Sequence, residues 1–357
     1  MISIDFGSYE TKVTDGKAVR GNIIINKAFS FDTPISSYEN GYIKNEISLL
    51  EIIRDKLKDN KIKFGDCSVN IKSTTIITRE IIFPLLSDKD IEGLLQYQLP
   101  EYLPMDMSKY VIQHKPLEKI IVDGNEKLNT LVAAIPKDIV DNHFHFLKEL
   151  GLRPVIMDFQ CNSIWKLFKH SNIINNRFST SDKTIAIVDL GYRSTSTTII
   201  KNDIMQFCRV FDAGGVNISD SLKELLSMSF GEISSNLNSI EDISIIEEGY
   251  TDYNRFVNIV RTGLDGIMER IDRIFRYFLA QEVGNEIQKI FLVGGLSNIK
   301  GIQNLFANYF NLPVFTIKNI DKVNMQEDLN KYFNCISALL RDDEVQKNER
   351  FKLFFWL

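Results

Sequence analysis

One arrangement of strands and turns occurs twice along the chain, and this duplication restricts the possible fold more than any other feature. In the first copy, strands at residues 2–6 and 10–14 lead through an Asp15-Gly16 hairpin turn into a long strand at residues 21–31. The second copy starts about 180 residues later and follows the same plan. Its parts are strands at residues 184–190, 194–200 and 204–211, with a turn at Lys201-Asn202-Asp203.

Each copy is followed by a helix and a further strand. Apolar residues at helical spacing predict the helices. These residues are Ile47, Leu50, Ile53 and Leu57 in the first half, and Ile218, Leu222, Leu225 and Leu226 in the second. The following strands are expected at residues 67–72 and 289–293. The order β-β-β-α-β, present twice, predicts two related α/β domains facing each other across a cleft.

Two segments lie outside the duplicated core. Residues 83–153 are expected to form an α+β insertion bounded by Pro84 and Pro154. It would contain a helix at residues 87–99, strands at 110–117 and 129–135, and a helix at 137–150. Residues 216–287 are predicted to be mostly helical, with one long amphipathic helix. Its apolar stripe is interpreted as core and comprises Phe256, Val260, Leu264, Ile267, Ile271, Ile274 and Phe278.

The first turn of the duplicated pattern has the residues of a phosphate-binding loop. Asp5 ends a buried strand, Gly7 permits a tight turn, and Ser8 and Lys12 follow. Backbone N–H groups at a glycine turn can point together at phosphate oxygens, and Lys12 adds positive charge. Asp5 would hold Mg²⁺ through water. Taken alone, this segment is equally an ordinary hairpin turn.

The second copy favours a nucleotide clamp over two ordinary turns. Asp189 and Gly191 repeat the pattern, and the hydroxyls of Ser194 and Thr195 follow. Two such turns can hold one phosphate chain from opposite walls. A Mg²⁺ ion between the carboxylates of Asp5 and Asp189 would relieve their repulsion and gather the phosphates.

Two diglycine turns follow in the second half. Gly294-Gly295 and then Ser297 come after a buried strand, where backbone can approach a purine or ribose. Gly214-Gly215 stands at the entry to the helical segment and is a second candidate for the lining of a nucleotide site. A plain strand-to-helix connection explains the later turn equally well by itself.

Composition narrows the classes of partner. A formal net charge of −5 gives no global basic field, so no nucleic-acid partner is expected. The four cysteines form no CxxC pair, which suggests a reducing compartment, and a protein-only metal site is not expected. No apolar run is long enough to cross a bilayer, and the first residues lack the pattern of a signal peptide, so a cytoplasmic protein is expected.

Two phosphate-binding turns followed by an adenosine-binding turn is the order found in the actin, hexokinase and heat-shock-chaperone ATPase superfamily. The chain resembles this superfamily. Within it, the chain is similar to the PilM family of actin-like proteins of type IV pilus machines, with FtsA as a more distant relative. The segments that carry the resemblance are MISIDFGSYETKV, IIFPLLSDKDIEGLLQYQLPEYLP, LVAAIPKDIV, LKELGLRPVIMDF, AIVDLGYRSTSTTII, FDAGGVNISDSL, FLVGGLSNIKGIQNLF and FNLPVF. The early insertion is the position of subdomain 1C in PilM and FtsA.

The resemblance implies an actin-like α/β fold with duplicated β-β-β-α-β domains around a nucleotide cleft. The implied division is subdomain 1A at 1–82, 154–180 and 325–345, subdomain 1C at 83–153, subdomain 2A at 181–215 and 288–324, a helical subdomain 2B at 216–287, and an aromatic tail at 346–357. It places the first phosphate turn at Asp5, Gly7, Ser8 and Lys12, and the second at Asp189, Gly191, Ser194 and Thr195. The nucleoside would lie along Gly214, Gly215, Gly294, Gly295 and Ser297. The implied cofactors are ATP or ADP with Mg²⁺.

Departures from the superfamily pattern favour slow or absent hydrolysis. Tyr192 and Leu296 stand where small residues are usual. At the connecting helix, Gln160 replaces the usual Glu and cannot act as a general base at neutral pH, although it can orient water. Asp158 remains a catalytic candidate beside it, and an ordinary polar helix start is the alternative for Gln160.

The implied partner is the N-terminal cytoplasmic peptide of a PilN-like inner-membrane protein, held between subdomains 1A and 1C, with other pilus platform proteins and assembly ATPases as further partners. The chain would then lie at the inner face of the cytoplasmic membrane, mainly through that partner. Aromatic and basic residues in the tail after Asn348 suit weak membrane docking or packing on protein. The alternatives are a polymerising FtsA-like cell-division protein and a small-molecule kinase of the same superfamily.

Overall fold

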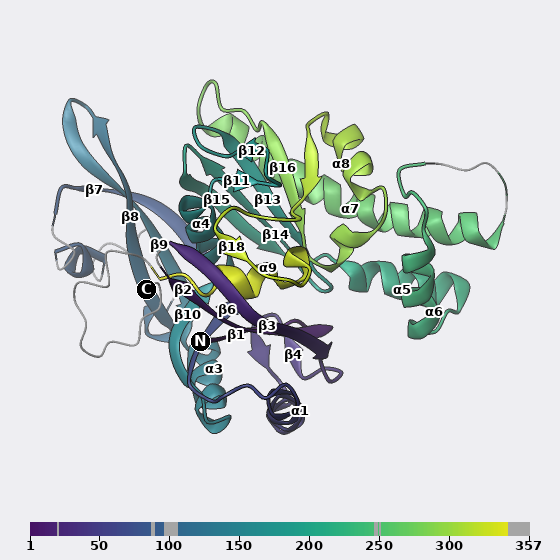
Figure 1. The fold of residues 1–357 in the computed structure, drawn as a ribbon. Helices are drawn as coiled ribbons and strands as arrows, with labels where there is room; N and C mark the ends of the chain where they lie inside the picture. Colours follow the sequence, from purple (N-terminus) through teal and green to yellow (C-terminus); the bar gives the residue numbers. More distant parts are fainter. Residues whose placement is uncertain (20, 87–89, 96–105, 246–248, 250, 342–357) are drawn as a thin grey trace.

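The computed structural model describes residues 1–19, 21–86, 90–95, 106–245, 249 and 251–341. Two β-sheets form its centre, and two helices lie between them (Figure 1). An insertion lies on one side of this centre and a group of helices on the other. The tail predicted at residues 346–357 lies outside the described residues.

The first sheet combines an antiparallel meander with parallel strands. Its order is β10 (Arg153–Phe159), β6 (Asp66–Ile71), β1 (Ile2–Asp5), β2 (Glu10–Val19), β3 (Asn22–Asp32) and β18 (Val323–Asn324). Strands β1, β2 and β3 pair antiparallel in sequence order, whereas β6 runs parallel to both β1 and β10. Helix α1 (Glu46–Asp59) lies between the meander and β6 in the chain.

The second sheet repeats this plan. Its order is β15 (Ile204–Phe211), β14 (Thr195–Lys201), β13 (Thr184–Leu190), β16 (Lys289–Val293) and β17 (Val314–Thr316). Strands β13, β14 and β15 form the meander, and β16 runs parallel to β13 and β17. Helix α5 (Gly215–Leu226) follows the meander. The duplicated β-β-β-α-β order predicted from the sequence is confirmed.

The hairpin turn predicted at Asp15-Gly16 is wrong. Strand β2 continues through these residues to Val19, and a register shift between Asp15 and Gly16 marks a β-bulge. Gly16 fits there because an added Cβ would lie 2.9 Å from the carbonyl oxygen of Ile24. The chain reverses later, before Asn22, where Gly21 has a φ of +76° that favours glycine. The Asp-Gly pair therefore marks a bulge inside a long strand.

Helices α4 (Gln160–His170) and α9 (Leu329–Ser337) join the two halves. Both contribute to one hydrophobic core that also includes residues of the two sheets. The ring of Phe168 on α4 lies 6.2 Å from Phe291 on β16 and 6.4 Å from Phe333 on α9, measured between centroids. These aromatic contacts connect the second sheet to the helices that pack on the first.

The insertion begins earlier than the sequence indicated. Its sheet has the order β7 (Ile77–Pro84), β9 (Asn125–Pro136) and β8 (Tyr110–Val122). Phe83 and Pro84 therefore belong to a strand, and the boundary predicted at residue 83 falls inside it. Buried Ile81 and Phe83 alternate with exposed neighbours, which is the pattern of a half-buried strand.

The helix predicted at residues 87–99 is described only at residues 90–95, which are helical, and its other residues lie outside the described part of the chain. Helix α3 (Lys137–Glu149) follows β9 directly and contacts β10. Its buried Phe146 and Leu147 belong to the same core as the first sheet. The insertion is thus anchored to the first domain through α3.

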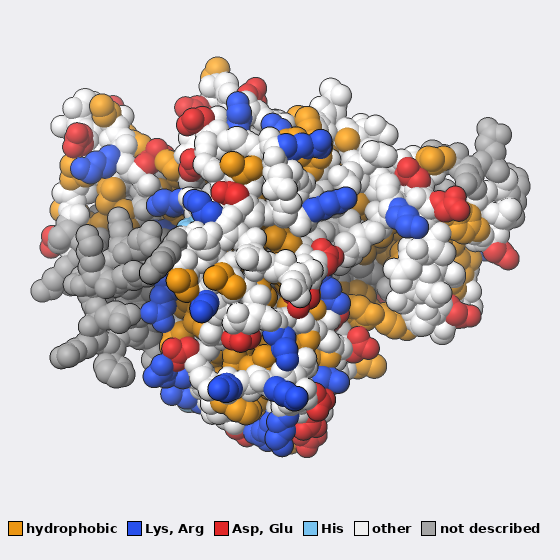
Figure 2. All heavy atoms as spheres, in the orientation of Figure 1, with side chains coloured by type: hydrophobic (Ala, Val, Ile, Leu, Met, Phe, Trp, Pro, Cys, Tyr) orange, Lys and Arg blue, Asp and Glu red, His pale blue; other side chains and the backbone are white. Residues whose placement is uncertain are grey.

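A second core lies under the helical segment. It is built from α5, α6 (Phe230–Ser239) and the long helix α7 (Asp252–Gln281), which pack against the second sheet. Each residue of the apolar stripe predicted for this helix is buried. Charged side chains of both signs are scattered over the face shown in Figure 2. No helix among the described residues is long and apolar enough to cross a membrane.

Candidate functional site

Polar residues gather where parallel strands of the two sheets end. Asp5 is the last residue of β1, Lys72 follows β6, and Gln160 follows β10. In the second sheet, Asp189 lies near the end of β13, and Gly294 follows β16. Ligands of open α/β sheets bind beyond the carboxyl ends of the strands. The two halves therefore present their polar ends to one shared site.

Asp189 is the centre of a buried hydrogen-bond network. Its Oδ2 accepts from Lys72 Nζ at 2.9 Å, from Asn334 Nδ2 at 3.2 Å and from Gln160 Nε2. Burial by itself raises the pKa of the Asp189 carboxyl, but Lys72 and the two amides outweigh burial and hold that pKa below its ordinary value. Asp189 is thus a stable carboxylate at the junction of the two domains.

Asp5 lies nearby, and its partners offset the burial of its carboxylate less than those of Asp189 do. Lys12 Nζ is 3.7 Å from its Oδ2, and Asn334 Nδ2 donates to the same oxygen at 3.5 Å. Burial raises the pKa of the Asp5 carboxyl, and the charge of Asp189 raises it further, against the opposing effect of Lys12 and Lys72. A cation placed between the two carboxylates would offset this cost.

Asp5→Asn is expected to stabilise the protein without ligand. Because the folded pKa of Asp5 lies above its unfolded value, stability is lost as the pH rises through the folded pKa. The neutral amide removes this loss at neutral pH, and the melting temperature should rise by roughly 2–4 °C for each kcal/mol of repulsion relieved. Thermal unfolding at pH 7 without nucleotide or metal measures the shift. A lower melting temperature for Asp5→Asn would contradict this description of the site.

The second predicted turn lies directly against Lys72. The Lys72 ammonium donates to the carbonyl oxygen of Ser194 at 3.3 Å, and a Cβ added to Gly191 would lie 2.8 Å from Lys72 Nζ. The N–H groups at the start of α5 are tied to this turn, since Gly215 N donates to Gly191 O at 3.1 Å. A Cβ at Gly214 would lie 2.5 Å from that same carbonyl oxygen. Glycine is therefore required where the turn, Lys72 and α5 converge.

The other residues predicted to line the nucleotide site have different roles in the structure. Gly294 has a φ of +88° and packs against the carboxylate of Asp189, so it belongs to the site. The Ser297 hydroxyl donates to Gly294 O at 2.7 Å, and the Thr195 hydroxyl donates to Ala213 O at 2.8 Å. Both hydroxyls support the backbone of the site in this conformation. Gly7 and Ser8 lie in the turn after β1, and Gly295 opens a short 3₁₀ helix beside Gly294.

Of the two residues predicted as catalytic candidates, only Gln160 contacts Asp189. Gln160 does reach the site: its Nε2 donates to Asp189 and to Asn334 Oδ1, and its Oε1 accepts from Ser196 Oγ at 2.8 Å. Both ends of this amide are occupied, so Gln160 fixes Asp189 in place in this arrangement.

Asp158 instead forms a buried ion pair. Its Oδ2 lies 2.7 Å from Lys166 Nζ and accepts from Ser163 Oγ at 2.9 Å, and both of its oxygens accept from Asn162 Nδ2. The Asp158 and Lys166 side chains are 1% and 3% exposed. A carboxylate with this set of partners has a structural role in place of the predicted catalytic one.

Aromatic rings from both domains meet beside the two turns predicted to bind phosphate. Tyr9 follows Ser8 in the first turn, and its ring centroid lies 5.3 Å from that of Tyr192 and 5.4 Å from that of Phe230 on α6. We call Tyr9, Tyr192 and Phe230 the aromatic cluster. An ion pair of 2.8 Å between Arg193 and Glu39 also connects the second turn to the first domain. Tyr192, whose bulk departs from the superfamily pattern, thus takes part in a contact between domains.

Sequence reasoning missed Lys72 and Asn334. Lys72 was included in a predicted strand, although its place at the end of a parallel strand was a usable signal. Asn334 lies on α9, far along the chain from both carboxylates that it contacts, and no local pattern indicates it. Within the described ranges, no cluster of three or more His, Cys, Asp or Glu side chains is placed to hold a metal ion.

Two facing sheets of the same β-β-β-α-β plan, with carboxylates and glycine turns at their junction, define the actin-like class of α/β proteins. The family model of type IV pilus assembly protein PilM matches residues 3–333, and the chain belongs to this family.

Solved structures agree on the fold. The chain is similar to one from a PilM-PilN type IV pilus biogenesis complex, with a TM-score of 0.77 and 17% identity over 95% of this chain and 96% of that one. It also resembles the ethanolamine utilization protein EutJ from Carboxydothermus hydrogenoformans, with a TM-score of 0.57 and 10% identity over 95% and 88%. A MamK double helical filament gives a TM-score of 0.54 and 11% identity over 98% and 99%.

Proposed function

We propose that this pilus-assembly protein is a nucleotide-gated scaffold. Its cleft would bind ATP or ADP with Mg²⁺, and the state of the cleft would set the affinity for the N-terminal cytoplasmic peptide of a PilN-like inner-membrane protein. The observation that carries the proposal is the convergence of Asp5, Lys72 and Asp189 with the Gly191 turn at the carboxyl ends of the strands. Membership of the PilM family supports the pilus context and the partner.

The residues present fit a magnesium nucleotide. The ammonium groups of Lys12 and Lys72 would bind phosphate oxygens, together with backbone N–H groups of the turn at Gly7. In the second turn, Gly191 N and Gly215 N already donate to Ser194 O and Gly191 O. Asp5 and Asp189 would hold Mg²⁺ through water, and the cation would offset the burial that raises the pKa of Asp5. Mg²⁺ supplies charge neutralisation between the phosphates. The nucleoside would lie along the backbone of Gly214, Gly215, Gly294, Gly295 and Ser297.

Slow or absent hydrolysis is part of this proposal. Gln160 is the polar side chain that follows β10, and an amide does not take up a proton at neutral pH. Its two ends are bonded to Asp189 and Ser196. Asp158 is committed to Lys166. The arrangement supports binding and a long-lived nucleotide state, which suits a scaffold.

A continuous set of contacts connects the cleft to the insertion. Lys72 contacts Asp189 and is followed, after a short loop, by β7 of the insertion. In that loop, Thr74 N donates to Asn40 Oδ1 at 2.8 Å. Asn40 is adjacent to Glu39, which pairs with Arg193 of the second turn. A change at the phosphate turns would therefore act on Lys72 and Thr74 of the loop that leads into the insertion.

Tyr9→Ala is expected to speed nucleotide release by about threefold to tenfold, because an aromatic pair is worth about 0.5–1.5 kcal/mol. The tyrosine ring contacts both Tyr192 and Phe230 of the other domain, so its loss lowers the barrier to opening. Stopped-flow displacement of a fluorescent ATP analogue measures the rate.

Tyr309→Ala is the matched control for Tyr9→Ala. Tyr309 is 42% exposed, close to the 37% of Tyr9, and lies on α8 (Ile302–Phe310). Release from this control should match wild type. Equal release rates for Tyr9→Ala and wild type would show that the aromatic cluster does not hold the cleft closed.

The proposal as a whole is tested by affinity capture. The full chain is passed over the immobilised N-terminal peptide of a PilN-like protein, with Mg²⁺ and ATP, ADP or no nucleotide. Retention that depends on the nucleotide supports a gated scaffold. Absence of retention in each state, together with sedimentation of filaments in ATP, would favour the polymerising alternative.

A further inference from the structure

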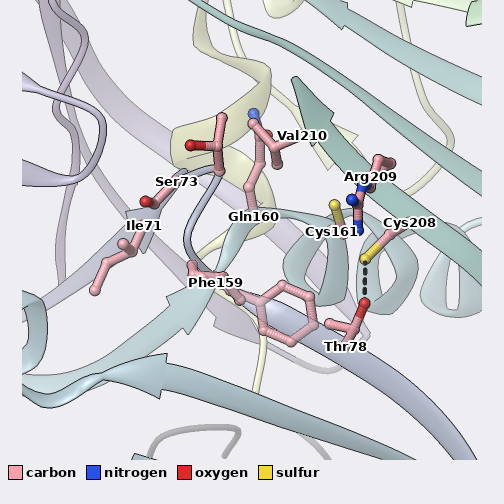
Figure 3. A pocket seen from close by; sticks show the side chains of 11 residues that line it. Ile71, Ser73, Thr78, Phe159, Gln160, Cys161, Cys208, Arg209 and Val210 are labelled. Carbon is pink, nitrogen blue, oxygen red and sulfur yellow. Dashed lines mark hydrogen bonds between the residues drawn. The ribbon is translucent and has the colours of Figure 1, made fainter. Parts of the chain in front are cut away.

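Two cysteines from different parts of the fold line one small cavity. Cys161 is in the first turn of α4, and Cys208 is on β15 of the second sheet. Figure 3 shows both cysteines among the side chains that line the cavity, with a dashed line between Cys208 and Thr78 of β7. The cavity volume is about 20 Å³, which is enough for a molecule of the size of water.

The two thiols differ in acidity. The neighbouring Cys161 thiol lowers the pKa of the Cys208 thiol more than burial raises it. Thr78 Oγ1, 3.6 Å from Cys208 Sγ, and the neighbouring Arg209 act in the same direction. The Cys208 thiol and burial together raise the pKa of the Cys161 thiol. Cys208 is therefore the more readily ionised partner, and a thiolate is the reactive form of cysteine.

The other two cysteines provide an internal contrast. Cys67 and Cys335 are fully buried. Burial raises the pKa of the Cys67 thiol to about 12 and that of Cys335 well above its ordinary value. Neither residue lines the cavity that contains Cys161 and Cys208. Low thiolate content and burial make both poor targets for an oxidant.

We propose that Cys161 and Cys208 form an oxidation site at which a hydroperoxide produces an intramolecular disulfide. The Cys208 thiolate attacks one peroxide oxygen, the O–O bond breaks, and a sulfenic acid forms with release of hydroxide. The Cys161 sulfur then attacks the sulfenic sulfur and expels the bound oxygen as a second hydroxide. The two thiol protons complete two waters. Two thiols are thus oxidised by two electrons, and one hydrogen peroxide is reduced.

The disulfide would connect helix α4, which joins the two halves, to strand β15 of the second sheet. Helix α4 packs in the core of the first sheet, and Cys161 directly follows Gln160, which contacts Asp189. Strand β15 is an edge strand of the second sheet. Oxidation would therefore fix the second sheet against α4 beside the cleft.

Oxidation of the full chain followed by thiol mapping tests the site. The protein is treated with hydrogen peroxide, unfolded, alkylated with iodoacetamide and mapped by mass spectrometry. Two of the four cysteines should resist alkylation, in a peptide pair that joins Cys161 to Cys208. The intact monomer should lose the mass of two hydrogens, and dithiothreitol should restore it. This readout needs no nucleotide or partner, so it succeeds or fails independently of the proposed function.

Variants separate the two roles. Cys208→Ser should leave Cys161 reduced, whereas Cys161→Ser should leave a sulfenic acid on Cys208 that dimedone traps. Cys67→Ala is the matched control and should still form the disulfide. The proposal is overturned if wild-type Cys208 gains oxygen without joining Cys161, if oxidation reaches Cys67 and Cys335 equally, or if all four thiols stay reduced.

Discussion

Asp158→Ala is expected to lower the free energy of unfolding by about 3–5 kcal/mol, the usual cost of removing one partner from a buried ion pair. The change leaves the Lys166 ammonium, whose side chain is 3% exposed, with the carbonyl oxygen of Leu340 as its remaining partner. It also removes the acceptor of Asn162 Nδ2, whereas the Ser163 hydroxyl keeps Asn70 Oδ1 as its acceptor. Urea unfolding followed by circular dichroism measures the loss.

A double-mutant cycle identifies the cause of that loss. Lys166→Met in the Asp158→Ala background removes the unpaired charge and should recover much of the stability. Asp66→Asn is the control, because Asp66 pairs with Arg153 at an exposed position and exposed pairs contribute little. If Asp158→Ala left stability unchanged and abolished nucleotide turnover, Asp158 would be catalytic after all.

Asp189→Asn is expected to weaken binding of a magnesium nucleotide by at least about 30-fold, which corresponds to about 2 kcal/mol. The substitution removes one of the two carboxylates proposed to hold Mg²⁺ through water. It also deprives Lys72 of its charge partner at 2.9 Å, so the lysine is no longer held in position. Calorimetric titration of ATP with and without Mg²⁺ measures both effects.

The pH dependence of stability checks the Asp189 network separately. The folded pKa of Asp189 is lowered, so its contribution is present above the unfolded pKa of about 4 and is lost as the pH falls through the folded value. The difference in unfolding free energy between wild type and Asp189→Asn should therefore shrink in acid. Asp203→Asn, at the β14–β15 turn, is the control for binding. Unchanged nucleotide affinity in Asp189→Asn would show that Asp189 does not help to hold Mg²⁺.

Local patterns predicted the larger part of the fold. The meander at residues 184–211, its Asn202-Asp203 turn and the stripe of α7 depend on alternation, turn residues and helical spacing, which are properties of neighbouring residues. The Asp15-Gly16 error has a similar origin. Glycine is common both in turns and in bulges. Here Gly16 pairs with Ile25 on the next strand, and this pairing, which makes the site a bulge, cannot be read from neighbouring residues.

The site was less accessible to sequence reasoning because its contacts join distant segments. Asp5 and Asp189 were found from the duplication, whereas Asn334 bonds to both from α9. Asp158 was misjudged for a different reason. It is on β10, whereas its partners Asn162 and Lys166 are on α4, so the ion pair depends on how the strand meets the helix and no period within one element indicates it.

Titration of the N-terminal cytoplasmic peptide of a PilN-like membrane protein into the full chain tests the central claim most directly. Calorimetry is performed with Mg²⁺ and ATP, with Mg²⁺ and ADP, and without nucleotide. A nucleotide-gated scaffold predicts saturable binding whose affinity differs between these states, and Asp189→Asn should abolish the difference while still binding the peptide. Equal affinity in the three states would contradict the gating, and no binding in any of them would contradict the proposed function itself.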